Sequence, residues 1–329
     1  MRQWFAERYP NLKTVIVFAL VCLFLPLAVT NDYYVATLSL FLINSLLLAS
    51  LMIIIGYAGQ ISLAHGAIYG LGAYVSAILT TRFELPFVVG FGAACLSGFL
   101  ISLVVGAPSL RLKGHFLAMA TLGIGEILYV LYKELDWLTG GVNGLIGIKP
   151  ASIGAFSFTH PLSYYYLVYV IAMQTLVLIA FLLDGKLGRA LRAVKSAEVA
   201  ALALGLNPSY YKLLAFTFAG IIAAAAGSLY AHLDRFVSPS TFSLSLSVML
   251  LSMVIAGGES SLGGSLVAAA VFSFLNEYVR QFQELSQLFF GFALLLVVIY
   301  FRGGLAGSWR RLLMLLNHAR TEENEGSGS

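Results

Sequence analysis

Apolar runs recur along the whole chain, and many of them approach the length of a membrane-spanning helix. A helix needs about 20 apolar residues to cross the hydrocarbon core of a bilayer, because each residue adds only about 1.5 Å along its axis. Of the 329 residues, 60% are hydrophobic and 10% are charged, whereas about a quarter of the residues of a soluble domain are charged. The pattern excludes a soluble globular domain and predicts a helical membrane domain crossed many times.

We expect an all-α polytopic membrane protein with about ten transmembrane helices and one membrane domain over residues 1–318. The expected spans are residues 14–29, 35–55, 61–81, 86–107, 115–132, 164–183, 211–232, 244–256, 264–279 and 288–301. A long polar segment, 133–163, separates the fifth and sixth spans. The tail 319–329 is small, polar and acidic, so it is expected to be disordered.

The basic residues set the expected orientation. With the N-terminus inside, the inner segments hold fourteen Lys and Arg residues and the outer segments hold five. Cytoplasmic loops carry the excess of positive charge in membrane proteins. Both termini and the segment 184–212 are therefore predicted to be cytoplasmic, and the segment 133–163 periplasmic.

The segment 184–212 is the longest polar break in the second half of the chain, and it holds five of the nineteen basic residues. Its apolar residues recur at roughly helical spacing: Leu191, Val194, Val199, Leu202 and Leu206. The pattern predicts a short amphipathic helix at the membrane surface. Taken alone, it fits equally a solvated loop kept inside by its charge or a docking surface for a soluble partner.

Part of this segment resembles a known family. Glu198, Ala200, Ala201 and Gly205 resemble the Glu-Ala-Ala coupling motif of ABC importer permeases. The longer string GRALRAVKSAEVAALALG is similar to the LivM-type branched-chain amino-acid permeases. The resemblance implies that the helix inserts into a groove of an ATPase subunit. The residues that it assigns to ATPase coupling are Gly188, Arg189, Arg192, Glu198, Ala200, Ala201 and Gly205.

The third span opens with the glycine-rich stretch GYAGQISLAHGAIYGLGAY. Small residues let membrane helices approach closely, which is one interpretation of Gly66 and Gly70. The other is an irregular segment whose polar groups line a pathway, since broken backbone is tolerated in a membrane only beside protein or water. On that interpretation the pathway candidates are Gln60, Ser62 and His65, although His65 also suits a helix-packing hydrogen bond. The stretch also resembles the LivM-type pattern, with Ala64 in place of the usual glycine.

Further pathway candidates lie within the spans. Glu126 belongs to the motif RLKGHFLAMATLGIGEIL, which resembles the family pattern except at His115. A carboxylate inside a span is costly unless it faces protein or water. Glu126 and Thr121 are predicted to border the pathway, or else Glu126 forms a structural hydrogen bond between helices. Asn44 and Gln174 are candidates of the same kind.

Within the outer segment, LTGGVNGLIGI resembles another stretch of the family. Its size makes it the expected docking place of a periplasmic binding protein, with Thr139, Gly140, Gly141, Asn143 and Gly144 as the contact residues; otherwise it is only a long connector. A weak internal similarity, Gly-x-x-Ser-Leu, relates residues 59–63 to residues 258–262. The predicted topology places both copies at the inner ends of outward-running helices.

The resemblance covers about residues 56–307 and implies a permease of the bacterial inner membrane that works by alternating access. The implied partners are a second related permease, two cytoplasmic ATPase subunits that bind ATP and magnesium, and a periplasmic solute-binding protein. The chain itself has no ATP-binding, catalytic or metal motif, so it is expected to be neither an enzyme nor a cofactor or nucleic-acid binder. The implied solute is leucine, isoleucine or valine.

Three alternatives stay open from the sequence. One is a related ABC importer of urea or a short amide, because sister families share these motifs. Another is a proton-coupled secondary transporter with Glu126 as its carrier site. The third is a membrane enzyme acting on lipids, which would need clustered acidic residues at one membrane face.

Overall fold

A computed structural model describes residues 10–29, 31–107, 112, 114–154 and 156–279 of the chain. The long helices are α2 (Pro10–Phe24), α3 (Asp32–Met52), α4 (His65–Thr81), α5 (Phe87–Gly106), α6 (His115–Glu134), α8 (Pro161–Asp184), α11 (Pro208–Asp234), α12 (Leu244–Gly257) and α13 (Leu262–Val279). The shorter ones are η1 (Leu25–Ala28), the π-helix η2 (Ile53–Tyr57), α7 (Asp136–Thr139), η4 (Gly141–Asn143), α9 (Lys186–Ser196), α10 (Glu198–Ala203) and η5 (Pro239–Phe242). The strands are β1 (Leu145–Ile146), β2 (Ser152–Ile153), β3 (Phe156–Ser157) and β4 (Phe236–Val237).

Each of the first nine expected spans coincides with a helix, and the tenth, 288–301, lies outside the described residues. In the described part of the chain, six helical stretches are long and apolar enough to cross a membrane, while α12 and α13 are apolar but shorter. The tail 319–329 also lies outside the described residues. The fold is an all-α bundle of apolar helices.

Capping residues explain where several helices begin. The side chain of Asn31 accepts a hydrogen bond from the backbone N–H of Tyr33 at 3.0 Å, at the start of α3. Asn207 does the same for Ser209 at 3.1 Å, and Pro208 occupies the first position of α11. A side-chain acceptor at the cap satisfies an N–H group that the helix leaves unpaired, and proline at the first position loses no helical hydrogen bond.

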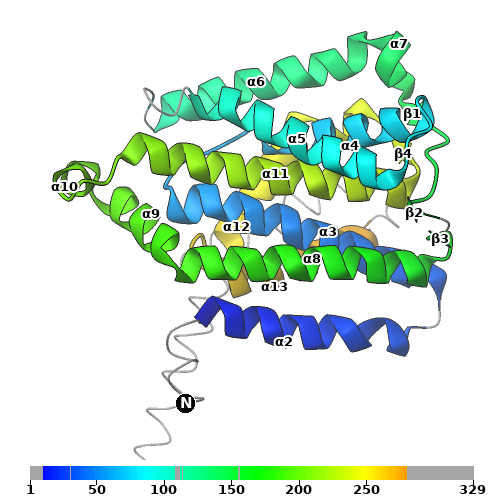
Figure 1. Ribbon diagram of the computed structural model, residues 1–329, viewed down its shortest axis with the longest axis horizontal. Helices are drawn as coiled ribbons and strands as arrows, with labels where there is room; N and C mark the ends of the chain where they lie inside the picture. Colours follow the sequence, from blue (N-terminus) through cyan, green and yellow to red (C-terminus); the bar gives the residue numbers. More distant parts are fainter. Residues whose placement is uncertain (1–9, 30, 108–111, 113, 155, 280–329) are drawn as a thin grey trace, which may run out of the picture.

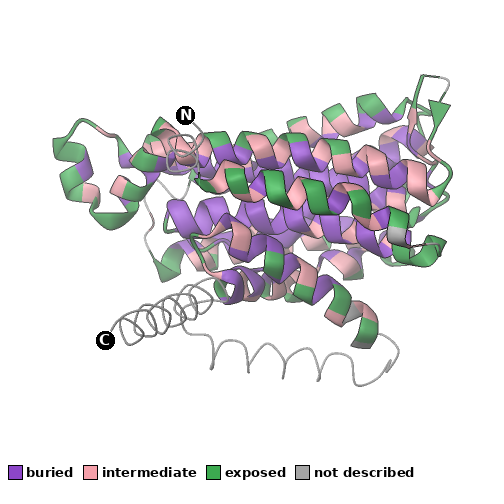
Figure 2. Ribbon diagram, turned by 90° about the horizontal axis from the view of Figure 1, so that it is seen from below, coloured by how far each residue is buried: buried purple, intermediate pink, exposed green. Residues whose placement is uncertain are grey.

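The helices run side by side in two groups (Figure 1). Helix α11 packs against α4 and α5, and helix α3 packs against α8 and α13. The groups join where α11 lies along α3, and α2 lies outermost against α8. Figure 2 shows the buried residues concentrated on these inner helices and the exposed ones on the periphery.

Small residues allow α4, α5 and α11 to approach closely. A Cβ atom at Gly72 would overlap the backbone of Ala224, and one at Gly227 would overlap the carbonyl oxygen of Tyr69. At the α5–α11 contact, a Cβ on Gly98 would lie 2.5 Å from the carbonyl oxygen of Gly220. The packing interpretation of the glycine-rich third span holds for Gly72, because backbones this close leave no room for side chains. Gly66 and Gly70, the residues it named, instead lie against the side chains of Ser247 and Phe242.

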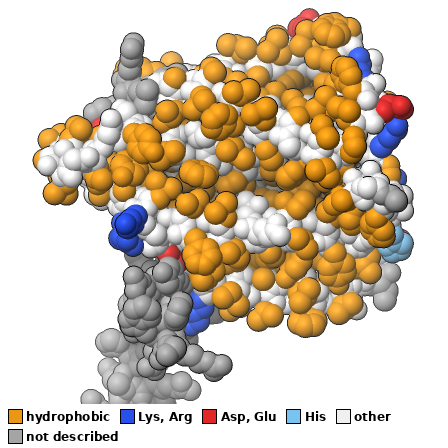
Figure 3. All heavy atoms as spheres, in the orientation of Figure 1, with side chains coloured by type: hydrophobic (Ala, Val, Ile, Leu, Met, Phe, Trp, Pro, Cys, Tyr) orange, Lys and Arg blue, Asp and Glu red, His pale blue; other side chains and the backbone are white. Residues whose placement is uncertain are grey.

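The surface of the bundle divides into an apolar side and two polar ends. On the face drawn in Figure 3, hydrophobic side chains cover the flank, and the charged side chains lie toward the ends. One end, here called the α9–α10 end, carries those two helices and the start of α2; the other, the strand end, carries α7 and the four strands (Figure 1). The strands pair as β1 with β4 and β2 with β3, both antiparallel.

Two expectations about local structure were wrong. The third span was expected to be helical from residue 61, but α4 begins at His65 and residues 59–64 form no regular structure. The segment 184–212 was expected to hold one amphipathic helix, but extended backbone at Ala197 divides it into α9 and α10. Apolar spacing could not reveal the division between α9 and α10. It grouped Leu191 and Val194, which are buried, with Val199 and Leu202, which are exposed.

Candidate functional site

Helix α9 is packed into the α9–α10 end. Its residues Leu191 and Val194 are almost fully buried, and a Cβ on Gly188 would overlap the backbone of Leu183 at the end of α8. The guanidinium of Arg189 donates a hydrogen bond of 3.0 Å to the carbonyl oxygen of Asp184. A cation at the last carbonyls of a helix is favourable, so the exposed Arg189 stabilises the α8 terminus.

Helix α10, in contrast, protrudes from the bundle at the left of Figure 1. Of its six residues, only Ala201 is buried. Val199 is 82% exposed and Leu204, just after the helix, is 78% exposed; Leu202 and Ala200 are also exposed. A cluster of exposed apolar side chains on a protruding helix is typical of a surface that a partner covers.

An ion pair joins the start of α10 to α11. The ammonium of Lys212 donates to the Glu198 carboxylate, with the Lys212 side chain 5% exposed and that of Glu198 31% exposed. A buried ammonium needs a partner, because an uncompensated charge in a low-dielectric interior is costly. Glu198 therefore has a structural role in positioning α10, which the sequence did not reveal because Lys212 lies beyond the motif.

Gly205 ends α10 in the left-handed conformation, with φ of +79°. The backbone N–H of Leu206 bonds back to the carbonyl oxygen of Ala201 at 2.9 Å, and that of Gly205 bonds to Leu202 at 2.9 Å. This is the terminating turn for which glycine is favoured, because it has no Cβ to clash. Space around Gly205 is open, so its requirement comes from the backbone alone.

Two cations of α9 reach the C-terminal end of the α3–η2 stretch. Arg192 lies over the ring of Tyr57, with 5.5 Å between its guanidinium carbon and the ring centroid. Lys195, one turn further on, donates hydrogen bonds to the carbonyl oxygens of Ile55 and Gly56 at 3.3 and 3.0 Å. Arg192 was expected to be an ATPase-coupling residue, whereas nothing but its charge marked Lys195 in the sequence.

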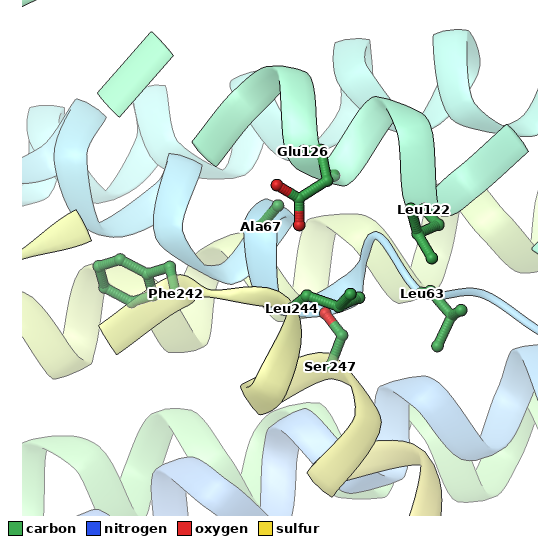
Figure 4. A pocket seen from close by; sticks show the side chains of 8 residues that line it. Leu63, Ala67, Leu122, Glu126, Phe242, Leu244 and Ser247 are labelled. Carbon is green, nitrogen blue, oxygen red and sulfur yellow. The ribbon is translucent and has the colours of Figure 1, made fainter. Parts of the chain in front are cut away.

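A narrow hollow lies between α4, α6 and the start of α12 (Figure 4). It is lined by Leu63, Ala67, Leu122, Gly125, Glu126, Phe242, Leu244 and Ser247. The Glu126 carboxylate points from α6 toward Ala67 and Leu244 (Figure 4). Glu126 is thus the one carboxylate among otherwise apolar and small neighbours. Within the described residues, no three His, Cys, Asp or Glu side chains come together as a metal site requires.

The irregular segment 59–64 leads into this hollow. The backbone N–H of Leu63 donates to the Thr121 hydroxyl at 3.1 Å, so Thr121 ties the segment to α6. Gln60 and Ser62 are buried. Among the described residues, neither the side-chain Oε1 atom of Gln60 nor the Ser62 hydroxyl has a hydrogen-bond partner. The broken backbone expected on the pathway interpretation is present, and it lies against protein.

The remaining pathway candidates lie elsewhere. His65 is fully buried, with its Nε2 atom 2.7 Å from the hydroxyl of Ser50 on α3, which matches the helix-packing interpretation. Asn44 donates to the hydroxyl of Ser273 at 2.9 Å and so joins α3 to α13. Gln174 is exposed on α8, and it is not among the described residues that line the hollow.

At the strand end, the expected docking residues divide by exposure. Thr139 is buried, with its hydroxyl donating to the carbonyl oxygen of Tyr132 at 2.8 Å, and a Cβ at Gly141 would overlap the Asp136 carboxylate. Gly140 and Gly144 are half-buried and adopt positive φ, whereas Asn143 is exposed. The exposed apolar side chains nearby are Trp137, Val142 and Ile146, which the sequence reading did not single out.

These features define a polytopic helical membrane protein with a carboxylate-lined hollow inside the bundle and an apolar helix exposed at one end. Residues 33–298 match the family described as "Branched-chain amino acid transport system / permease component". The chain belongs to this family, and it is therefore a component of a transport system and a multi-pass membrane protein.

Individual relatives agree with the family match. The chain is 34% identical over 312 residues to the high-affinity branched-chain amino acid transport system permease protein LivM of Escherichia coli K12, covering 88% of this chain and 73% of that protein. It is 32% identical over 288 residues to LivM of Salmonella typhimurium LT2, covering 80% and 68% respectively. The autoinducer 2 import system permease protein LsrC of Salmonella typhi is 24% identical over 267 residues, covering 78% and 73%. No solved structure matches the chain significantly.

Proposed function

We propose that the chain is the permease subunit of an ATP-driven importer of leucine, isoleucine and valine. The observation that carries the proposal is the 34% identity to LivM of E. coli across 88% of the chain. The mainly apolar lining of the hollow suits an apolar side chain, and Glu126 offers a counter-charge for an amino group. The more distant resemblance to autoinducer 2 permeases shows why the solute needs a direct test.

The proposed topology has ten spans and both termini in the cytoplasm of a bacterial inner membrane. Among the described residues, the α9–α10 end carries Lys186, Arg189, Arg192, Lys195 and Lys212. The excess of basic residues at this end supports its assignment to the cytoplasm. The strand end is then periplasmic.

The proposed partners follow from the two ends. Exposed Val199, Leu202 and Leu204 would insert into a groove of one of two cytoplasmic ATPase subunits, which bind ATP and magnesium. A periplasmic binding protein would dock on the strand end near Asn143 and its exposed apolar neighbours. A second, related permease would complete the central pathway beside this chain.

The proposed mechanism is alternating access past the hollow. Leu63 and Leu244 lie on different segments of its wall, and Glu126 projects from α6 on the opposite side (Figure 4). Outward opening would accept the solute from the binding protein, and ATP hydrolysis would reset the pathway. Glu126, Thr121, Gln60 and Ser62 are the proposed pathway residues; His65 and Asn44 are the weaker candidates because both already bond within the bundle.

The test is uptake of labelled leucine and labelled urea in a strain lacking the chain and in the same strain with it restored. We expect leucine uptake to be lost and recovered, with urea uptake unchanged. Loss of urea uptake alone would favour the amide importer. Uptake that persists without the ATPase subunits and collapses with an uncoupler would contradict an ATP-driven mechanism.

A further inference from the structure

The inner end of α3 is closed by groups from distant parts of the chain. The backbone N–H of Ala58 donates a hydrogen bond of 3.1 Å to the carbonyl oxygen of Ile53. The backbone N–H of Gln60 donates one of 3.0 Å to the carbonyl oxygen of Ile54. The next two carbonyl oxygens, those of Ile55 and Gly56, are bonded by the ammonium of Lys195. The last carbonyls of a helix have no partner within it, so Lys195 supplies from α9 what α3 lacks.

The same ammonium reaches the turn between α12 and α13. Its Nζ atom lies 3.5 Å from the Glu259 carboxylate, so its three donors face three acceptors. The hydroxyl of Ser260 donates to the carbonyl oxygen of Gly56 at 3.0 Å, and a Cβ on Gly56 would overlap the carbonyl oxygen of Glu259. The end of α3 and the α12–α13 turn are therefore in direct contact at the point where Lys195 binds both.

The stem of Lys195, a residue partly open to solvent, also packs against Gly59. A Cβ on Gly59 would lie 2.9 Å from its Cγ atom, and Gly59 has a φ of +66° that favours glycine. This contact places Lys195 against the first residue of the irregular stretch that leads to Leu63 and the hollow. Both Gly-x-x-Ser-Leu copies, beginning at Gly59 and Gly258, meet at this cluster, although they do not make a symmetric repeat.

We infer that Lys195 is the positioning residue that transmits movement of α9–α10 to the pathway walls. It holds α9 to the end of α3 and to the α12–α13 turn, so that displacement of α9 moves both together. From α3 the displacement passes through residues 58–64 to Leu63; from the turn it passes along α12, whose residues Leu244 and Ser247 line the hollow. The inference rests on the proposed function, because it assumes that an ATPase displaces α10.

The experiment uses the complete importer in proteoliposomes, with labelled leucine uptake and ATP hydrolysis measured on the same sample. Lys195→Met keeps an unbranched apolar stem against Gly59 and removes the ammonium. We expect about a tenfold loss of uptake, within the usual range for coupling between two sites, with ATP hydrolysis retained. ATP consumed per leucine imported should therefore rise by the same factor. Lys195→Arg should retain most uptake, since it keeps a cation with several donors.

Two controls identify the contact responsible. Lys186→Met removes a charge from the same helix, at an exposed residue, and should leave uptake unchanged. The double variant Lys195→Glu with Glu259→Lys preserves the ion pair. It removes the residue-195 donor to the carbonyl oxygens of Ile55 and Gly56, so uptake should stay low. Recovery in the exchanged variant would overturn the carbonyl-binding role and leave only an ion pair.

Other outcomes are equally informative. Normal uptake by Lys195→Met would overturn the inference while leaving the proposed function intact. Loss of uptake, ATP hydrolysis and co-purifying ATPase subunits together in Lys195→Met would be a different result. It would also overturn the inference, because Lys195 would then serve to dock the ATPase subunits. Failure of the unaltered complex to import leucine with ATP would instead contradict the proposed function itself.

Discussion

Helices α9 and α10 are consecutive in the chain, yet they meet the bundle in opposite ways. Helix α9 buries Leu191 and Val194, and its cations bind carbonyl oxygens and an aromatic ring of neighbouring segments. Helix α10 exposes its apolar side chains and is joined to the bundle by the Glu198–Lys212 pair. The difference matches the two tasks we propose: α10 would be covered by a partner, and α9 would carry displacement into the bundle.

The largest effect is expected from Glu198→Lys, which would free α10 from α11. Lys212 would remain buried beside a second positive charge, and losing one partner of such a pair costs about 3 kcal/mol. We take the lower end of the known range because Glu198 is partly exposed. Uptake should fall about 100-fold in membranes that still contain the protein, as measured by labelled leucine uptake and immunoblotting.

The matched control for this reversal is Glu84→Lys at the strand end. Glu84 pairs with Lys149 at 2.9 Å, but both side chains are largely exposed. Exposed pairs contribute little to stability, so uptake should not change. Normal uptake from well-expressed Glu198→Lys would show that α10 needs no anchor on α11.

The next effect tests whether α10 is covered by a partner. Val199→Asp combined with Leu202→Asp places carboxylates on the exposed face of α10. Each of these apolar side chains is worth about 2 kcal/mol when buried in an interface, so co-purification with the ATPase subunits should fall at least about tenfold. The thermal unfolding midpoint of the isolated permease should stay the same. Leu191→Asp on α9 should show the reverse, with a lower midpoint because Leu191 is buried. Unchanged co-purification would show that the ATPase subunits do not cover the exposed face of α10.

Two glycines offer a smaller and sharper comparison. Gly188→Ala on α9 would press a methyl group into the Leu183 backbone, and overpacking of this kind costs about 2 kcal/mol. At Gly205, after α10, the added methyl group of Gly205→Ala would meet open space. The only cost is that of holding alanine in the left-handed conformation, about 1 kcal/mol. Thermal unfolding in detergent should therefore rank Gly188→Ala as the more destabilised variant. The opposite ranking would mean that α8 and α9 can separate without cost.

The smallest expected effect concerns pH. Hydrogen bonding and the charge of Lys149 lower the pKa of the exposed Glu84 carboxyl below its ordinary value. A lowered pKa in the folded state contributes stability that is present above the ordinary pKa of about 4.3 and is lost as pH falls through the lowered pKa. Glu84→Gln should leave the unfolding midpoint at pH 7 nearly unchanged and slightly flatten its decline below pH 4. A large loss at pH 7 would show that this exposed pair is as important as Glu198–Lys212.

Sequence reasoning predicted the positions of the spans well and the roles of polar residues poorly. The helices cover all nine spans that can be compared, but α4 starts at His65 rather than at residue 61. Of the pathway candidates, Glu126 lines the hollow while Gln174 is exposed on α8. Polarity inside an apolar run marks a residue as unusual, but it cannot say which side of a helix faces the bundle when the whole helix is apolar.

The sequence by itself determined the membrane class, the positions of the apolar helices and the family, because the cost of placing residues in a bilayer depends on local composition and run length. The tertiary structure alone decided that α9 is packed while α10 protrudes, and that Lys195 binds Gly56 across 139 residues of chain. Contacts of this kind depend on where separate helices end in space. No local pattern encodes that position, because it is set by the packing of all the helices together.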